Sequence, residues 1–139
     1  IIEPIKEEDV LLGIHCCGNT DWSMLTETKI DIISFDAFGF LDRVILYAQD
    51  LNNFLSRGGI LAWGIVPTNE FKGQGQTELI QRFEDGVETL VKKGISKNLI
   101  LERSLITPSC GTGNLSEAIA EEILKLNARV SSVLRKEYF

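Results

Sequence analysis

The sequence lacks the features that nucleic-acid-binding and membrane proteins need. Its 14 Lys and Arg residues are outnumbered by 20 Asp and Glu residues, which gives a formal charge of -6. The sequence therefore offers no stripe of basic residues to which a nucleic-acid backbone would bind. Long apolar runs are missing as well, because the longest stop after about eight residues and a membrane helix needs roughly 20. We expect no nucleic-acid partner and no membrane span.

A secretion signal and a disulfide framework are also missing from the sequence. Residues 1–9 mix charges with no apolar segment ahead of a small-residue cleavage site, so we expect a cytoplasmic location. The chain starts at Ile1 rather than at a methionine, and we expect that further sequence precedes it. The three cysteines, Cys16, Cys17 and Cys110, are odd in number and two are adjacent, which disfavours disulfide pairing. Metal binding or thiol chemistry is the alternative.

What the sequence does contain is the pattern of one α/β domain spanning residues 1–139. A hydrophobic content of 44% with 24% charged residues is ordinary for a globular domain of this length. Short apolar segments, each followed by helical periodicity, predict strands over 10–16, 32–35, 60–66 and 99–106. Parallel strands need a crossover of a dozen or more residues, so this alternation predicts four parallel βα units. The strands are apolar on both faces, which predicts a sheet covered on both sides.

The predicted helices occupy the segments between these strands. A short helix is expected over 21–28, and a longer one from Leu41 to Leu55 should stop at the glycines 58–59. A third is expected between a Thr77 cap and Gly94. In the last, the spacing of Asn114 and Glu117 predicts a capping box.

Two architectures are compatible with four parallel βα units. One is a small open doubly wound sheet, and the other is half of a TIM (β/α)8 barrel, in which four units take roughly 125 residues. An open sheet would mark its edge strands with charge, proline or brevity, and only the second strand is brief. We therefore favour the half-barrel. It implies that further sequence or a partner chain, for example a second copy in a homodimer, supplies four more strands.

The residues that point to chemistry follow the first and last strands. His15 and Cys17 are two positions apart and share a face, whereas Cys16 points the other way and is expected to pack. Cys110 follows the fourth strand, and the carboxyl ends of parallel strands lie on one side of a sheet. An imidazole and two thiolates suit zinc and leave a fourth position open. Asp36, which ends the second strand, is a candidate fourth ligand or nearby negative charge.

The alternative interpretation gives these residues a purely structural role. His15 would then be a hydrogen-bonded core histidine, and the cysteines would be small buried apolar residues. If zinc does bind, the two thiolates neutralise its charge and weaken it as an electrophile toward water, but a thiol bound to it still loses its proton. Thiol alkylation therefore fits the ligand set better than hydrolysis. Asn19 and Trp63 are candidate substrate-binding residues, although a Trp on a buried strand is also typical of a core.

Three segments carry a resemblance to a known superfamily. The sequences HCCGNT (15–20), DIISFD (31–36) and PSCG (108–111) resemble the carboxyl-terminal half of the cobalamin-independent methionine synthase and uroporphyrinogen decarboxylase superfamily. Within it, the zinc methyltransferase branch, which includes methylcobamide:coenzyme M methyltransferases, looks most similar. The resemblance implies a TIM barrel in which zinc activates a small thiol acceptor, such as homocysteine or coenzyme M, for methylation. A corrinoid protein is one carrier of the methyl group that it implies.

The family's ligands can be carried over residue by residue. Its His-x-Cys pair corresponds to His15 and Cys17, and its distal cysteine corresponds to Cys110. A glutamate approaches the zinc in methionine synthase, and here that position is Asp36, one methylene shorter. Uroporphyrinogen decarboxylases lack such a zinc site, so retention of all three ligand types argues against decarboxylation of a porphyrin-like acid.

A second hypothesis gives the chain no catalytic role of its own. The family's groups for the acceptor's amino end and for the methyl donor lie largely in the first half of the barrel, which has no counterpart among these residues. The chain would then be a non-catalytic fragment or a partner-binding module.

Overall fold

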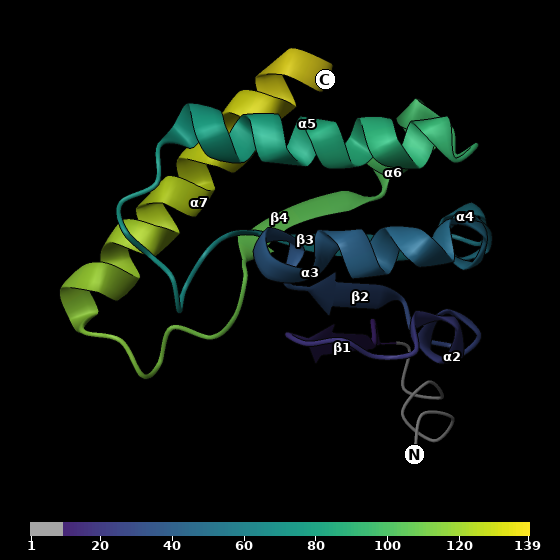
Figure 1. Cartoon of the computed structure of the whole chain (residues 1–139), viewed down its shortest axis with the longest axis horizontal. Coiled ribbons are helices and arrows are strands. Elements are labelled where there is room, and N and C mark those ends of the chain that lie inside the picture. The colour runs from purple at the N-terminus through teal and green to yellow at the C-terminus, as the bar shows by residue number, and fades with distance from the viewer. Residues whose placement is uncertain (1–9) are drawn as a thin grey trace.

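Four parallel strands alternate with helices in residues 10–139, the part of the chain that the computed structural model describes (Figure 1). The strands are β1 (Gly13–Cys16), β2 (Ile32–Phe35), β3 (Ile60–Val66) and β4 (Ser104–Pro108). They form one sheet in the order β1-β2-β3-β4, and every neighbouring pair is parallel. The predicted α/β fold with four parallel strands is confirmed.

The helices connect these strands and follow the last one. They are α2 (Trp22–Thr26), α3 (Ala37–Val44), α4 (Ala48–Ser56), α5 (Gln76–Lys92), α6 (Lys97–Glu102) and α7 (Glu117–Tyr138). A 3-10 turn, η1 (Ile45–Tyr47), joins α3 to α4. The single helix predicted over 41–55 is thus three consecutive pieces, and a non-helical Phe40 also kinks α3. As predicted, Gly58 follows this region with a positive φ of 100°, which glycine adopts without steric cost.

The predicted bounds of β2 and β3 are confirmed, whereas those of the outer strands are not. β1 begins at Gly13 rather than at residue 10, and β4 begins at Ser104 rather than at residue 99. Residues 99–102 belong instead to α6, where Ile100 is fully buried. A short apolar run has the same composition in a buried strand and a buried helix turn, so periodicity could not separate the two.

Two of the predicted helix caps are wrong. α5 begins after Gly75, and Thr77 lies inside the helix. α7 begins after Ser116, whose Oγ accepts a hydrogen bond from the backbone N of Ile119, while Asn114 stays outside the helix. Glu117 is the first residue of α7 and not the third, so the expected capping box does not form. Asn114 and Ser116 both carry side chains that can cap a helix, and α7 uses Ser116, whereas α5 begins after Gly75 without a side-chain cap.

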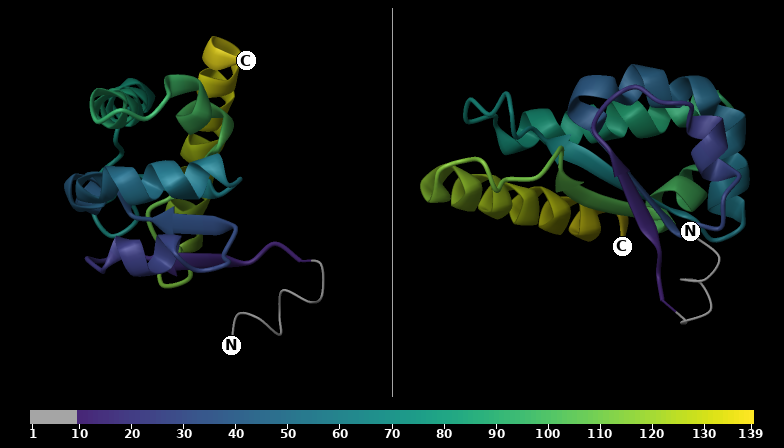
Figure 2. Two further views of the ribbon diagram at one scale, coloured as in Figure 1. Left: turned by 90° about the vertical axis from the view of Figure 1, so that its right-hand side faces the viewer. Right: turned by 90° about the horizontal axis from the view of Figure 1, so that it is seen from below.

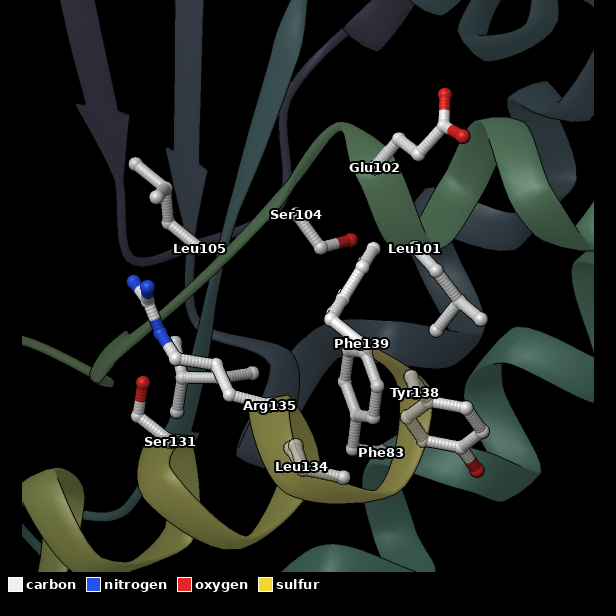
Figure 3. Close-up of a pocket in the computed structure, with 11 residues that line it drawn as sticks. Phe83, Leu101, Glu102, Ser104, Leu105, Ser131, Leu134, Arg135, Tyr138 and Phe139 are labelled. Carbon is white, nitrogen blue, oxygen red and sulfur yellow. The ribbon is translucent and has the colours of Figure 1, made fainter.

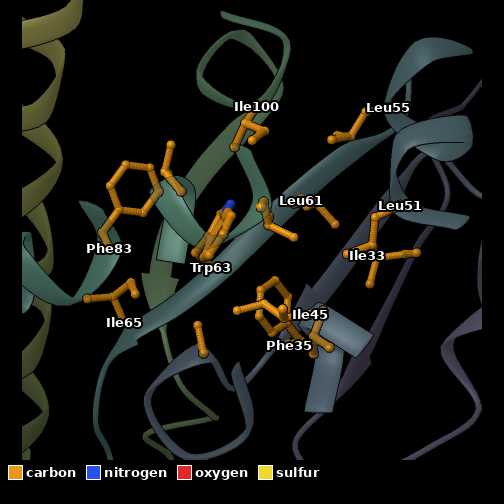
Figure 4. Close-up of a cluster of buried hydrophobic side chains, with 14 of the residues drawn as sticks. Ile33, Phe35, Ile45, Leu51, Leu55, Leu61, Trp63, Ile65, Phe83 and Ile100 are labelled. Carbon is orange, nitrogen blue, oxygen red and sulfur yellow. The ribbon is translucent and has the colours of Figure 1, made fainter. Parts of the chain in front are cut away.

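The core lies on one face of the sheet. Alternate residues of β2 and β3 point toward it, and Phe35, Trp63 and Ile65 are fully buried. Their partners come from helices, as Phe83 of α5 and Ile100 of α6 show (Figure 4). The ring of Trp63 lies 5.3 Å from that of Phe35 and 5.2 Å from that of Phe83. Burial of each such side chain contributes roughly 1.5–3 kcal/mol.

The opposite face of the sheet is more open. His15, Ser34, Ala62 and Leu105 lie side by side across the four strands. Of these, His15 and Leu105 are exposed and Ser34 is half-buried. Helices α3, α4, α5 and α7, seen from two further directions in Figure 2, contribute buried apolar residues to the hydrophobic core. The prediction that both faces are covered therefore applies to β3 alone, whose residues 61–66 are buried.

Candidate metal centre

His15, Cys17 and Cys110 come together at the carboxyl ends of β1 and β4. One ligand atom from each residue lies within 4.8 Å of the others. His15 belongs to β1, Cys17 follows its last residue, and Cys110 follows β4 by two residues. Because the sheet is parallel, the carboxyl ends of β1 and β4 lie on the same side of it, and the residues at these ends meet there. The convergence expected from the sequence is present in the structure.

The loop that carries Cys110 is held at its base by hydrogen bonds between Ser109 and residues at and just after the end of β3. The backbone N of Ser109 donates to the carbonyl of Val66 at 2.8 Å. The backbone N of Thr68 donates to the Ser109 hydroxyl at 3.1 Å, and both residues are buried. Buried polar groups that are paired in this way keep a single arrangement. These hydrogen bonds hold Ser109 in place, and Cys110 follows it directly in the chain.

Gly64 of β3 makes this close approach sterically feasible. A Cβ atom at this position would lie 2.6 Å from the carbonyl oxygen of Phe35 and 2.7 Å from the Cα of Ser109. Both are backbone atoms, which cannot rotate away as a side chain would. The absence of a side chain at residue 64 thus lets the start of the Cys110 loop sit against the sheet.

His15 is held by the neighbouring strand. Its Nδ1 lies 2.9 Å from the hydroxyl oxygen of Ser34, its register partner on β2. The side chain is exposed, so the interpretation of His15 as a core histidine is wrong. Cys16, between the two cluster residues, packs against the core, and its thiol donates to the carbonyl of Gly18 at 3.4 Å. The alternation expected for residues 15–17 is confirmed.

The two clustered sulfurs influence each other electrostatically. The pKa of Cys17 is raised, first by its hydrogen bond to the Cys110 side chain and next by the charge of that group. Two thiolates in proximity repel each other, so the second proton leaves less readily. A cation bound between the sulfurs would offset that repulsion. The donor set and its spacing are thus suited to a metal ion.

The other predicted site residues lie outside this cluster. The Asp36 carboxylate caps α3 by accepting a hydrogen bond from the backbone N of Gly39 at 2.7 Å. Asn19 is exposed in the turn between β1 and α2. Trp63 has no exposed surface and lies on the core face, where its Nε1 donates to the Ser104 hydroxyl at 2.9 Å. The structure therefore brings together three of the predicted residues and assigns Asp36 and Trp63 structural contacts.

Sequence reasoning missed two residues that organise the site. Ser34 contacts His15, and Ser109 lies at the base of the Cys110 loop, but serine carries no distinctive signal in a strand or a turn. For Ser34 a partial signal exists, because it lies two positions before Asp36 and so shares its strand face. Its contact with His15 depends on the pairing register of β1 and β2, and this register cannot be read from the sequence of either strand alone.

A cavity of about 470 Å³ lies elsewhere, between β4 and α7 (Figure 3). It is lined mainly by apolar side chains, among them Leu105, Leu134 and Phe139, with Arg135 at its wall. None of the three clustered residues lines it. This hollow is therefore separate from the candidate metal centre.

Comparisons with known proteins assign no family. No family model matches the chain, and no curated protein or solved structure matches it significantly. Among the described residues, none of the helices has the length and apolar character needed to cross a membrane. What is established is a parallel α/β fold with a His/Cys/Cys group able to hold a metal ion.

Proposed function

We propose that the chain binds zinc through His15, Cys17 and Cys110 and that the bound zinc serves methyl transfer to a small thiol. The observation that carries the proposal is the approach of the three ligand atoms to within 4.8 Å of one another. The resemblance of segments 15–20, 31–36 and 108–111 to the zinc methyltransferase branch supports the same hypothesis, zinc-dependent methyl transfer.

Zinc is the metal that the donor types favour. Magnesium and calcium prefer oxygen ligands, whereas thiolates and imidazoles suit zinc. Three protein ligands leave one position of a tetrahedral site for a substrate or water, which is typical of catalytic zinc. Two of the three residues, His15 and Cys17, are exposed, so an incoming thiol could reach the cluster.

The chemistry follows from the charge of the ligands. Zinc, when bound, would remove the proton of a coordinated thiol and keep its sulfur nucleophilic toward a methyl group. The two thiolates of Cys17 and Cys110 balance the charge of the ion, which disfavours activation of water. Homocysteine or coenzyme M is the class of acceptor that we propose, with a corrinoid protein as one methyl carrier. Asn19, exposed in the turn after β1, is the substrate-binding candidate that remains accessible.

We also propose that the four units are half of a (β/α)8 barrel. The strand order β1-β2-β3-β4 contains no reversal, whereas a doubly wound sheet reverses its order at a switch point. Right-handed crossovers in such an order place successive helices on one face, where the core lies. The open face, which carries His15 and Ser34, would then line the barrel interior.

Metal content of the purified protein tests the zinc proposal. We expect about one zinc per chain, which is lost in Cys17→Ser and in Cys110→Ser because each variant removes one of the three ligands. Cys16→Ser is the matched control, since this cysteine packs against the core, and it should retain the metal. A wild-type chain that is folded by circular dichroism and yet binds no zinc would overturn the proposal.

A second candidate function is partner binding, and the sheet edges favour it. Large apolar side chains are exposed beside the outer strands: Leu11 before β1 is 72% exposed, and Leu105 of β4 is 40% exposed. Parallel strands with free edges accept further strands. A second copy of the chain, with its β1 beside β4, is the partner that we propose for this surface.

A further inference from the structure

We propose that Ser34 is a positioning residue that orients the His15 imidazole and accepts its Nδ1 proton in a hydrogen bond, so that Nε2 is free for metal binding. This inference rests on the proposed metal site. It assigns a role to a residue of β2 that contributes no ligand itself.

The contact between the two side chains follows from the pairing of the strands. Ser34 and His15 are register partners on parallel strands, so their side chains leave the sheet on the same face. The hydroxyl oxygen of Ser34 lies 2.9 Å from Nδ1 of His15. On its other side, Ser34 pairs with Ala62 of β3, whose methyl group offers no hydrogen bond. The imidazole is therefore the hydrogen-bonding neighbour that the sheet provides for this hydroxyl.

The hydrogen bond decides which nitrogen is free for a metal. Each nitrogen of a neutral imidazole either carries a proton or offers one lone pair. If Ser34 donates to Nδ1, the proton sits on Nε2 and neither nitrogen can bind a metal without breaking that arrangement. If Nδ1–H donates to the Ser34 oxygen, the lone pair of Nε2 is free. Metal binding thus selects the arrangement in which Ser34 accepts.

The same contact limits rotation of the ring. His15 is exposed, so the core does not hold its imidazole in place. A ring with free rotation must be ordered when it joins Cys17 and Cys110 around an ion, which costs conformational entropy. The Ser34 oxygen removes part of this cost because it orients the ring before the metal arrives. Hydrogen bonds of this kind to a ligand typically change metal affinity about 10- to 100-fold.

The test compares zinc affinities, measured by competition with a chromophoric chelator. We expect Ser34→Ala to weaken zinc binding about 10- to 100-fold. Ser34→Thr and Ser34→Val have almost equal volumes and both suit a strand, so they isolate the hydroxyl. The Thr variant should bind like the wild type, and the Val variant should bind like Ser34→Ala. Ser132→Ala, on the exposed side of α7, is the control for a lost serine hydroxyl.

A double-mutant cycle separates positioning from a general structural effect. In a His15→Ala background, Ser34→Ala should cause no further loss of affinity, because the imidazole that it orients is gone. The absorption spectrum of bound Co²⁺ provides a second readout, which Ser34→Val should alter and Ser34→Thr should preserve.

The outcomes distinguish this inference from the proposed function. Equal zinc affinities for wild type and a folded Ser34→Val variant would overturn the role of Ser34 and leave the metal site standing. An additional loss in the His15→Ala background would also overturn it. A wild-type chain without zinc affinity would instead refute the proposed function.

Discussion

The two candidate ligands at the end of β1 owe their arrangement to the two-residue period of a strand. His15 and Cys17 emerge on one side, and Cys16 between them packs against the core, so two adjacent cysteines have different environments. The third candidate ligand, Cys110, comes from a distant loop whose base is held by hydrogen bonds of Ser109. At the scale of single residues, the site therefore depends on a few polar contacts that order exposed side chains.

Substitutions of Asp36 distinguish a structural role of its carboxylate from a metal-binding role. Its carboxylate caps α3 at Gly39, and we expect Asp36→Ala to lower the free energy of unfolding by about 0.5–2 kcal/mol, the usual cost of a lost cap. Asp36→Asn keeps the cap and should change stability by a few tenths of a kcal/mol. Chemical denaturation measures both. Zinc affinity should be the same in the two variants, and a parallel loss of affinity would show that the carboxylate acts on the metal.

At the scale of elements, the ends of β3 and β4 connect the fold to the site. β3 is buried along residues 61–66, and the Cys110 loop rests against it where Gly64 leaves room. The neighbouring hydrogen bonds among Val66, Thr68 and Ser109 all lie in this junction. A disturbance of this junction should affect both stability and the position of Cys110.

Gly64→Ala tests this connection. The added Cβ would meet backbone atoms of Phe35 and Ser109, so we expect a loss of about 1–3 kcal/mol in the free energy of unfolding, typical of overpacking. Because the Cys110 loop must move, zinc affinity should fall as well. Gly113→Ala is the control, since a Cβ there meets nothing within 4 Å. Thermal unfolding and chelator competition provide the two measurements, and an unperturbed Gly64→Ala variant would contradict this account.

At the scale of the whole molecule, the sheet has two outer strands and one open face. β1 and β4 lie at opposite sides of the sheet (Figure 1), and apolar side chains are exposed beside both. A two-fold axis along the barrel would place the β4 of one copy beside the β1 of another, with every pair parallel. Eight strands arranged in this way close a barrel and leave no edge.

Association of the chain tests this arrangement. We expect light scattering after gel filtration to give a mass near twice the 15.5 kDa of one chain. Leu105→Lys places a charge on the edge strand and should shift the equilibrium to the monomer, because an edge charge opposes strand addition. Leu46→Lys is the control, at a side chain of η1 that is 69% exposed. A folded wild-type monomer at every concentration would contradict the proposed dimer.

The sequence by itself determined the parallel α/β fold, the bounds of β2 and β3, and the convergence of the candidate ligands at residues 15, 17 and 110. These features depend on local periodicity and on the rule that parallel strands end on one side, both of which a sequence expresses directly. Only the tertiary structure decided that 97–102 is a helix, that Trp63 faces the core and that Asp36 caps α3. It also paired Ser34 with His15 and Gly64 with the Cys110 loop. Such contacts join residues that are distant in sequence. They depend on strand register and packing, which cannot be read from any single segment.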